Sequence, residues 1–292
     1  MAAGKSTRMK SALPKAAHPI CGKPMARHII DACRQAGVRD VVVVVGHEAE
    51  TVVSTLGDDV RYAHQSEQLG TGHACREAMP AITEDVDSVI VLPGDTPLVT
   101  PDLLKRLIST HYNRNNAATL VTAVLEDAAH YGRIVRDADG AVMRVQEAKD
   151  APPEVLALGE INTSIYCFAR RLLAQSLESL KDDNAQGEYY LTDVVGILSD
   201  RGHRVGALVA DDPADVLGIN NRVELAEAGA VMRRRILAEL MLSGVTIMDP
   251  QTTWIDCDVQ IAPDTVVHPC TVIGRGSRIG FGANKTRSSG NG

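Results

Sequence analysis

Short apolar runs alternate with helix-like stretches along most of the chain. The continuous aliphatic runs over 41–45 and 88–92 are typical of strands that are buried on both faces. Further strands are expected over 60–63, 118–125 and 161–168, and helices over 25–35, up to Leu56, over 70–79 and from Pro101. Strands that alternate with helices indicate an α/β domain with a mostly parallel sheet.

Several residues are typical of the first and last positions of helices. Thr100 followed by Pro101 predicts a helix start, because a threonine hydroxyl caps free amides and proline suits the first turn. Gly37 and Gly244 are typical of helix stops, the second after a helical stretch over 222–242. We therefore expect the α/β domain over 1–222 and a linker helix over 223–244.

A six-residue period follows the linker helix. The aliphatic residues that keep it are Ile255, Ile261, Val267, Ile273 and Ile279. Such a period is typical of a left-handed parallel β-helix, in which each hexapeptide forms one side of a triangular coil. The period stops after Ala283, so we expect a truncated β-helix of fewer than two coils over 245–283 and a disordered tail over 284–292.

Composition narrows the class of protein. Hydrophobic residues make up 45% of the 292 residues but aromatic residues only 3%, which suits a core of alanine, valine, leucine and isoleucine. The net charge of −7 argues against nucleic-acid or anionic-membrane partners. No apolar run reaches the ~18 residues of a membrane span. Six scattered cysteines without a C-x-x-C pair indicate reduced thiols in a cytosolic protein.

The amino-terminal segment is basic and contains a small-residue loop. It reads Ala-Ala-Gly-Lys-Ser-Thr-Arg from Ala2 to Arg8, and Pro14-Lys15 follows. It is not a Walker A loop, because that loop needs another glycine five residues before Gly4-Lys5. Backbone amides with an arginine and a lysine nevertheless suit a triphosphate. A solvated basic loop is the alternative interpretation.

Two further segments are candidates for a ligand site. Asp95 follows Gly94 at the end of the 88–92 strand, where open α/β sheets bind ligands. It could hold Mg²⁺ beside phosphates or cap a helix. The segment from Gln65 to His73 combines amide side chains with glycines and could contact a nucleobase. The spacing of serine, histidine, cysteine and aspartate indicates no acid/base array.

These segments together resemble a known family. Residues 2–15 resemble the nucleotidyltransferase signature G-x-G-T-R-x-x-x-x-x-P-K. The supporting segments are 65–73, Gly94-Asp95, 131–134, Glu147, 160–163, 184–193 and 218–222. On them the chain is identified as a member of the bacterial bifunctional N-acetylglucosamine-1-phosphate uridyltransferase / glucosamine-1-phosphate acetyltransferase family. The resemblance covers nearly all of the uridyltransferase half and the first coils of the other half, and it implies a Rossmann-like nucleotidyltransferase domain.

The resemblance implies a role for each matching residue. Arg8 and Lys15 would be catalytic groups on the phosphates, and Asp95 and Asn220 would hold Mg²⁺. Residues that would bind UTP and N-acetylglucosamine 1-phosphate are Ala2, Ala3, Gly4, Lys15, Gln65, Gly70, Thr71, Gly94, Gly132, Glu147, Asn162 and Asn220. Within this set Gln65, Gly70 and Thr71 would read uracil, and Gly132, Glu147 and Asn162 would receive the sugar. The products would be pyrophosphate and UDP-N-acetylglucosamine, a cell-envelope precursor made in the cytoplasm.

Three positions depart from the family pattern. Ser6 and Ser164 stand where the family usually has glycine, and Met1 stands in place of a leucine that closes a hydrophobic strand. We therefore expect the first, central strand to be missing. The alternatives are another sugar-1-phosphate nucleotidyltransferase or a catalytically dead fragment. The short β-helix predicts no acetyltransferase activity, and a monomer or aggregates instead of the family trimer.

Overall fold

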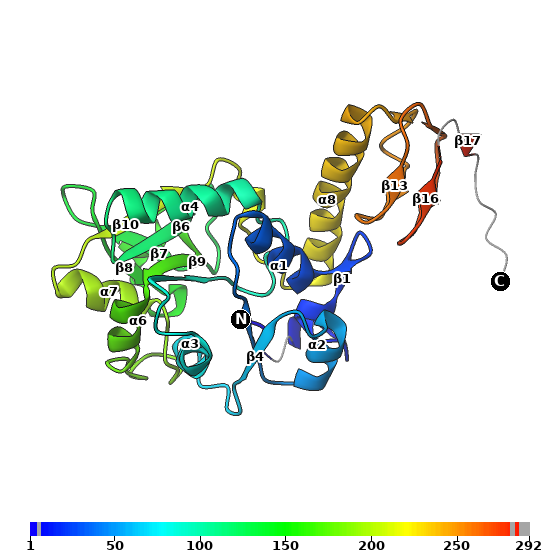
Figure 1. Cartoon of the computed structure of the whole chain (residues 1–292). Helices are drawn as coiled ribbons and strands as arrows, with labels where there is room; N and C mark the ends of the chain where they lie inside the picture. Colours follow the sequence, from blue (N-terminus) through cyan, green and yellow to red (C-terminus); the bar gives the residue numbers. More distant parts are fainter. Residues whose placement is uncertain (5–6, 281–283, 286–292) are drawn as a thin grey trace.

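The computed structural model describes residues 1–4, 7–280 and 284–285. Figure 1 shows an α/β part on one side and, beyond the long helix α8 (Arg222–Leu242), a narrow stack of short strands. None of the helices in the described part is long and apolar enough to cross a membrane. Short 3-10 helices lie at η1 (Thr7–Met9), η2 (Lys15–Ala17), η3 (Met79–Ala81), η4 (Ala148–Asp150) and η5 (Pro213–Asp215).

The main sheet of the α/β part has six strands. They are β5 (Ser88–Val91), β6 (Ala118–Val124), β7 (Arg133–Arg136), β8 (Val142–Gln146), β9 (Glu160–Ala169) and β10 (Val205–Val209). Strand β9 runs antiparallel to both β5 and β6, and β10 runs parallel to β6. The prediction of a mostly parallel sheet is therefore wrong for this half. Strand β9 follows the β7–β8 hairpin and the single-turn helix α5 (Pro153–Leu156), not a crossover helix long enough to return it parallel.

Helices cover both faces of this sheet. Helix α4 (Pro101–Asn113) packs on the face that carries Val121. Helices α6 (Arg170–Leu177) and α7 (Asp193–Asp200) pack on the face that carries Leu120. Adjacent residues of β6 thus point into two cores, which explains the uninterrupted apolar run in the sequence. The Thr100 hydroxyl accepts a hydrogen bond from Leu103 N at 3.2 Å, so the predicted start of α4 is confirmed.

The amino-terminal third forms a smaller unit beside this sheet. Its elements are β1 (Pro19–Ile20), β2 (Lys23–Pro24), α1 (Met25–Gln35), β3 (Val42–Val45), α2 (Ala49–Leu56), β4 (Arg61–His64) and α3 (Thr71–Ala78). Strands β3 and β4 form a separate parallel pair. In the part of the chain that the structure describes, one isolated bridge, between Ala2 and Val45, adds to this pair. Within the described residues, β3 and β5 are therefore not paired with each other.

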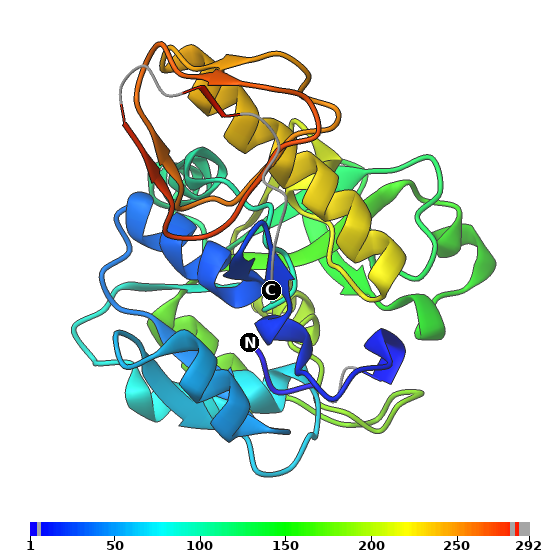
Figure 2. The same ribbon diagram turned by 90° about the vertical axis from the view of Figure 1, so that its right-hand side faces the viewer.

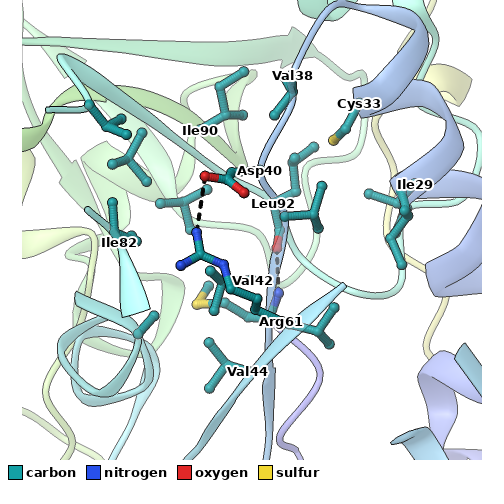
Figure 3. A pocket seen from close by; sticks show the side chains of 18 of the residues that line it. Ile29, Cys33, Val38, Asp40, Val42, Val44, Arg61, Ile82, Ile90 and Leu92 are labelled. Atoms are coloured by element: carbon teal, nitrogen blue, oxygen red, sulfur yellow. Dashed lines mark hydrogen bonds and ion pairs between the residues drawn. The ribbon is translucent and has the colours of Figure 1, made fainter. Parts of the chain in front are cut away.

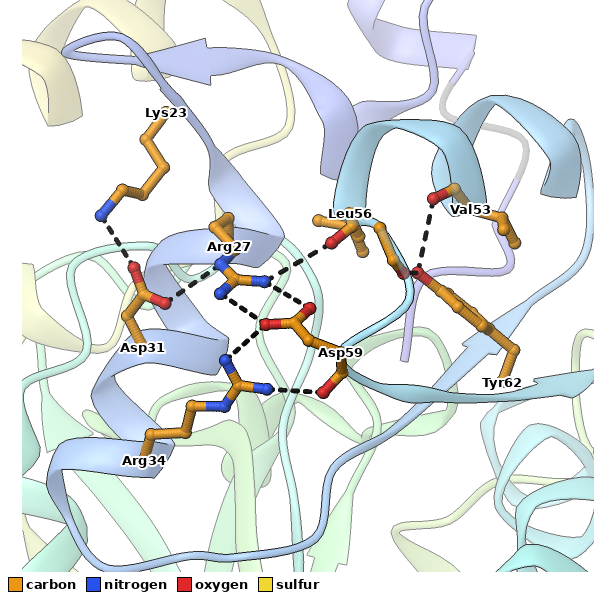
Figure 4. A network of polar contacts seen from close by, with 9 residues as sticks. Lys23, Arg27, Asp31, Arg34, Val53, Leu56, Asp59 and Tyr62 are labelled. Atoms are coloured by element: carbon orange, nitrogen blue, oxygen red, sulfur yellow. Dashed lines mark hydrogen bonds and ion pairs between the residues drawn. The ribbon is translucent and has the colours of Figure 1, made fainter. Parts of the chain in front are cut away.

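Ion pairs fix α1 against the chain that enters β4 (Figure 4). The Arg27 guanidinium donates to both carboxylate oxygens of Asp59 at 2.7 Å, and Arg34 donates to Asp59 at 2.6 Å. Arg27 and Lys23 also contact Asp31. These two arginines hold the pKa of the Asp59 carboxyl well below its usual range. The network positions α1, which covers one side of β3.

The predicted hexapeptide coils are present beside α8. The strands are β11 (Thr246–Ile247), β12 (Trp254–Ile255), β13 (Gln260–Ile261), β14 (Val266–Val267), β15 (Val272–Ile273), β16 (Arg278–Ile279) and β17 (Asn284–Lys285). The five periodic aliphatic residues are all buried, and ladders join residues 18 apart, such as Ile255 with Ile273. Seen in Figure 2, these coils have a roughly triangular outline.

The ladder extends past the expected end of the coils. Strand β17 pairs with β14 through Asn284 and Lys285, two residues inside the segment that we expected to be a tail. Strand β11 adds a side before the first hexapeptide that the periodicity identified. Residues 281–283 and 286–292 lie outside the described part, so the division of the chain into three parts stays a prediction.

Candidate functional site

A cleft of about 640 Å³ opens where the amino-terminal loop, the end of β5 and the segment before α8 meet. Eleven of the predicted site residues line it: Ala2, Ala3, Gly4, Arg8, Lys15, Gln65, Gly70, Thr71, Gly94, Asp95 and Asn220. They come from four stretches of the chain, which are 2–15, 65–71, 94–95 and the segment that contains Asn220. The fold therefore brings together the predicted phosphate, metal and nucleobase residues.

Two cations and two oxygen ligands form one corner of the cleft. The Arg8 Nη2 donates to Asn220 Oδ1 at 2.7 Å, and the Lys15 Nζ donates to the same oxygen at 3.0 Å. The Lys15 ammonium also forms an ion pair with the Asp95 carboxylate. Both side chains of this pair are less than a quarter exposed. The two predicted basic residues thus meet in this corner, Lys15 partly buried and Arg8 exposed, and the solvated-loop alternative stays open.

Backbone contacts place Asp95 in this corner. Gly94 N donates to Met1 O at 2.7 Å, and a Cβ on Gly94 would lie only 2.6 Å from that oxygen. A side chain at this position would therefore push the amino-terminal loop away from β5. Ile219 N donates to Asp95 O at 2.9 Å, which sets Asn220 beside the aspartate. Thr100, not Asp95, caps α4, so the helix-cap alternative for Asp95 is wrong.

The first turn of α8 holds Asn220. Glu224 Oε2 accepts hydrogen bonds from Asn220 N at 2.6 Å and from Asn220 Nδ2 at 3.3 Å. Its other oxygen, Oε1, accepts from Asn221 Nδ2 at 2.5 Å. Because the amide nitrogen of Asn220 is bound on the helix side, its Oδ1 is directed to Arg8 and Lys15. The sequence reasoning missed Glu224, although its position three residues after Asn221, the N-cap residue, is a recognisable capping signal.

The loop before α3 forms the opposite wall. Gln65 is buried, and its Nε2 donates to Gly70 O at 3.1 Å and contacts His73 Nδ1 at 3.0 Å. Gly70 has φ +107°, and a Cβ there would lie 2.6 Å from Tyr189 O. Leu191 N donates to Thr71 Oγ1 at 3.0 Å. The 188–191 segment therefore supports the loop from behind through backbone contacts that exclude a Cβ at Gly70.

The three predicted sugar residues form a second cluster. They do not line the cleft itself, but they lie beside one another. Asn162 N donates to Gly132 O at 2.8 Å, and a Cβ on Gly132 would lie 3.5 Å from Glu147 Oε2. Glu147 Oε1 accepts from Thr192 Oγ1 at 3.0 Å. Burial raises the pKa of the Glu147 carboxyl, which the Thr192 hydroxyl partly opposes.

Ser164 connects the second cluster to the cleft. It lines the cleft, and its backbone N donates to Asn162 Oδ1 at 3.3 Å. Its φ of +60° is a conformation that favours glycine, so the departure from the family pattern falls where a side chain is strained. Glu188, Gln68 and Thr7 also line the cleft and were not predicted. Glu188 lies inside a segment that carries the family resemblance. Ser6 lies outside the described residues.

The corner fits a divalent cation by its donor set. Mg²⁺ binds one or two protein oxygens and leaves its other positions to water and substrate phosphates. Asp95 supplies a carboxylate and Asn220 an amide oxygen, and the single Lys15 ammonium contacts both. Among the described residues there is no group of three or more histidine, cysteine, aspartate or glutamate side chains that could hold a metal by themselves.

Comparison with known proteins supports the predicted family. The bifunctional protein GlmU of Brevibacillus brevis is 51% identical over 92% of this chain and 58% of that protein. The GlmU proteins of Acetivibrio thermocellus and Streptomyces avermitilis are each 48% identical, over 94% and 97% of this chain and 59% and 60% of theirs. The chain thus spans about three fifths of the length of these relatives.

The predicted resemblance is therefore confirmed, and the domain comparison agrees with it. The family described as MobA-like NTP transferase domain matches residues 1–195, which is more than half of the chain. The chain belongs to the MobA-like NTP transferase family and is a nucleotidyltransferase.

Proposed function

We propose that this chain transfers a uridylyl group from UTP to N-acetylglucosamine 1-phosphate, giving UDP-N-acetylglucosamine and pyrophosphate. The observation that carries the proposal is the corner formed by Arg8, Lys15, Asp95 and Asn220. It lies in the same cleft as the Gln65 loop and next to the Glu147 cluster. With its phosphates in the corner, UTP would have its base beside the Gln65 loop, and the acceptor sugar would lie beside the Glu147 cluster.

The reaction needs charge neutralisation and positioning, not a general base. The attacking group is a phosphate monoester, whose second pKa of about 6 leaves it largely ionised at neutral pH. A sugar-phosphate oxygen forms a bond to the α-phosphorus of UTP. The bond from that phosphorus to the bridging oxygen of pyrophosphate breaks. Arg8 and Lys15 would bind the phosphate oxygens and stabilise the charge on the leaving pyrophosphate.

Asp95 and Asn220 would hold Mg²⁺ in this corner. Bound there, the ion would neutralise negative charge on the triphosphate. Lys15 would then leave the Asp95 carboxylate and bind a phosphate oxygen of the triphosphate instead. Glu224 would keep Asn220 Oδ1 directed into the corner during that exchange.

Gln65 would select the base. An amide nitrogen has two hydrogens, and both have acceptors inside the loop, at Gly70 O and His73. What Gln65 offers a ligand is then its carbonyl oxygen, which suits the N3–H donor of uracil. Cytosine presents an acceptor at that atom. Two facing acceptors in a buried site cost ~1–3 kcal/mol, so UTP should be preferred to CTP by roughly 5- to 150-fold in kcat/KM.

The second cluster would receive the acceptor sugar. Glu147 is an acceptor for sugar hydroxyls, and the lack of a side chain at Gly132 leaves room beside it. Asn162 is oriented by its Nδ2 donation to Tyr166 Oη at 2.7 Å. An amide held in this way can bind the N-acetyl group. The strained Ser164 lies between this cluster and the phosphates, where the sugar 1-phosphate would bridge them.

Pyrophosphate release tests the proposal. We expect release from UTP with N-acetylglucosamine 1-phosphate and Mg²⁺. Asp95→Asn should lower turnover at limiting Mg²⁺ at least ~100-fold, because loss of a metal-binding charge removes several kcal/mol of stabilisation. The matched control is Asp139→Asn, which makes the same charge change on an exposed turn that does not line the cleft. Equal turnover of the two variants would refute the assignment of Asp95.

The same assay separates the alternatives. Comparison of UTP with dTTP, CTP and GTP distinguishes the proposed uridyltransferase from another sugar-1-phosphate nucleotidyltransferase. No pyrophosphate from any nucleotide, with the chain folded, would identify a catalytically dead protein. The lack of acetyltransferase activity stays a prediction, which acetyl-CoA consumption in the presence of glucosamine 1-phosphate tests.

A further inference from the structure

Gln65 is held in place up to its terminal amide. Strand β4 is anchored at its start, where Arg61 forms an ion pair with Asp40 at 3.1 Å (Figure 3). At its end the parallel ladder continues into Gln65, whose backbone N donates to Val45 O at 2.8 Å. Gln65 itself is buried. A half-turn of the amide would still exchange its carbonyl oxygen and its NH2 group, which offer a ligand opposite hydrogen bonds.

Two neighbours set the orientation of this amide. Gln65 Nε2 lies 3.1 Å from Gly70 O and 3.0 Å from His73 Nδ1. A carbonyl oxygen accepts hydrogen bonds and does not donate them, so the NH2 group faces Gly70 O and donates one hydrogen to it. The second hydrogen goes to His73 Nδ1, because an amide NH2 group donates and does not accept. An imidazole whose Nδ1 accepts carries its hydrogen on Nε2.

Glu77 favours the same tautomer of His73. It follows His73 by four residues on α3, so the two side chains lie on one face of the helix. Glu77 Oε1 lies 3.3 Å from His73 Nε2. A hydrogen on Nε2 is attracted to this carboxylate, whereas a lone pair on Nε2 would be repelled by it. The carboxylate therefore stabilises the form of His73 that accepts from Gln65.

Contacts with the rest of the protein keep α3, and with it His73, in place. Gly72 N donates to Tyr189 O at 2.7 Å. Arg76 Nη2 donates to Leu177 O at 2.8 Å, and the Arg76 guanidinium lies over the Tyr189 ring at 5.1 Å from its centroid. The His73 side chain is 13% exposed. The imidazole thus presents a fixed acceptor to Gln65.

We propose that His73, held as the Nε2–H tautomer by Glu77, is the positioning residue that fixes the Gln65 amide and thereby makes the cleft prefer uracil to cytosine. This inference rests on the proposed function, in which Gln65 contacts the base. To donate to N3 of cytosine, the amide would have to turn by half a rotation. Its oxygen would then face two acceptors, Gly70 O and His73 Nδ1, and each buried pair of facing acceptors disfavours the turned amide roughly 5- to 150-fold.

The first test removes the acceptor on α3. His73→Phe keeps an aromatic ring but has no lone pair for Gln65. The ratio of kcat/KM for UTP to kcat/KM for CTP, each with N-acetylglucosamine 1-phosphate and Mg²⁺, should fall at least ~5-fold, because one of the two facing acceptors is gone. A residue that only supports the fold would lower both kcat/KM values together and leave their ratio unchanged.

A matched pair of variants tests Glu77, whose side chain is 40% exposed and does not line the cleft. Glu77→Gln keeps an oxygen that can accept from His73 Nε2, so the ratio should stay near that of the parent. Glu77→Lys places a donor there, which favours a lone pair on Nε2 and a hydrogen on Nδ1. The ratio should then fall ~2- to 10-fold, the equivalent of one hydrogen bond.

Nitrogen-15 NMR of the imidazole rings gives a readout that does not depend on activity. A ring nitrogen with a hydrogen and one without it have well-separated signals, and the His73→Phe spectrum identifies His73 among the nine histidines. In the parent we expect the hydrogen on Nε2 and none on Nδ1. Glu77→Lys should raise the share of the other tautomer, and Glu77→Gln should not.

A hydrogen on Nδ1 of His73 in the parent would overturn the proposal, as would a UTP-to-CTP ratio that is the same in the parent and in His73→Phe. Failure of the proposed function would look different, since the parent would then turn over neither nucleotide. In that case the ratio of the Kd values for UTP and CTP, measured by calorimetry, replaces the kinetic ratio. An equal Kd ratio in the parent and in His73→Phe, or binding of neither nucleotide, would overturn the inference as well.

Discussion

Gly70 links the backbone of the loop before α3 to the 188–191 segment behind it, and Gly70→Ala tests that link. Gly70 has φ +107° and ψ 177°, a conformation that is essentially restricted to glycine. A Cβ at this position would meet Tyr189 O at 2.6 Å, Glu188 Cβ at 2.9 Å and Tyr189 N at 2.9 Å. None of these three atoms is the end of a flexible side chain, so the backbone itself must move.

The expected decrease in the free energy of unfolding has two parts. Placing alanine in this conformation costs about 1–3 kcal/mol. Displacing the 188–191 segment costs a further ~1–3 kcal/mol, as for overpacking elsewhere. Gly57 provides a matched control, since its φ of +79° and ψ of −167° lie in the same region, and a Cβ there would meet nothing within 4 Å. Gly57→Ala should therefore lose only the first part.

Urea unfolding and nucleotide binding together test this reasoning. Gly70→Ala should be ~1–3 kcal/mol less stable than Gly57→Ala, which is the cost of the collision alone. It should also bind UTP at least ~10-fold more weakly, because Gly70 O orients the Gln65 amide and ~1.4 kcal/mol corresponds to tenfold. Equal stability of the two variants, or unchanged UTP binding by Gly70→Ala, would refute the argument.

Three further predictions concern Glu147, Glu224 and the hexapeptide coils. Burial raises the pKa of the Glu147 carboxyl in the folded protein. Such a group contributes stability at a pH below its unfolded pKa, and this contribution is lost as the pH rises through the folded pKa. Glu147→Gln should therefore be more stable than the parent at pH 7, with a difference that shrinks toward pH 4; urea midpoints at both pH values check this, and a difference that grows on acidification would contradict it. Glu224→Ala should weaken Mn²⁺ binding about 10-fold, as measured by electron paramagnetic resonance. Glu224→Gln keeps an acceptor for Asn220 N, so its Mn²⁺ affinity should stay near that of the parent. Similar affinities for the two variants would contradict the positioning role of Glu224. Val267→Ala, at a fully buried position of β14, should lose ~2 kcal/mol, whereas Val272→Ala, 65% exposed on β15, should lose almost nothing; equal losses would show that the hexapeptide residues do not form the core.

Local chemistry made much of the fold predictable. The residues 25–35 and 222–242 form helices with the expected bounds, and Thr100 caps α4, because helix ends depend on nearby residues. The six-residue period fixed the buried positions of the coils, because each side of a coil repeats the same environment. The direction of β9 was not predictable in this way. It depends on which strand the β7–β8 hairpin returns to, and an apolar run looks the same in either direction.

The residues of the candidate site were likewise predictable only in part. Residues of the amino-terminal loop and Asp95 carry charges in a recognisable pattern, and the structure brings them together in one cleft. Glu224 and Ser164 were harder to identify as parts of the site, because their roles follow from contacts with Asn220 and Asn162. A sequence shows that a glutamate suits the first turn of a helix. It does not show that Asn220, two residues before that helix, meets Arg8 and Lys15.

The central claim is that one cleft holds UTP, Mg²⁺ and a sugar 1-phosphate in position for transfer. Phosphorus-31 NMR of the full chain with UTP, N-acetylglucosamine 1-phosphate and Mg²⁺ measures this directly. We expect the signals of UTP and of the sugar phosphate to decline together, while those of a diphosphate sugar nucleotide and of pyrophosphate rise in equal amounts. Unchanged UTP and sugar phosphate in the presence of folded protein, or release of inorganic phosphate without a sugar nucleotide, would contradict it.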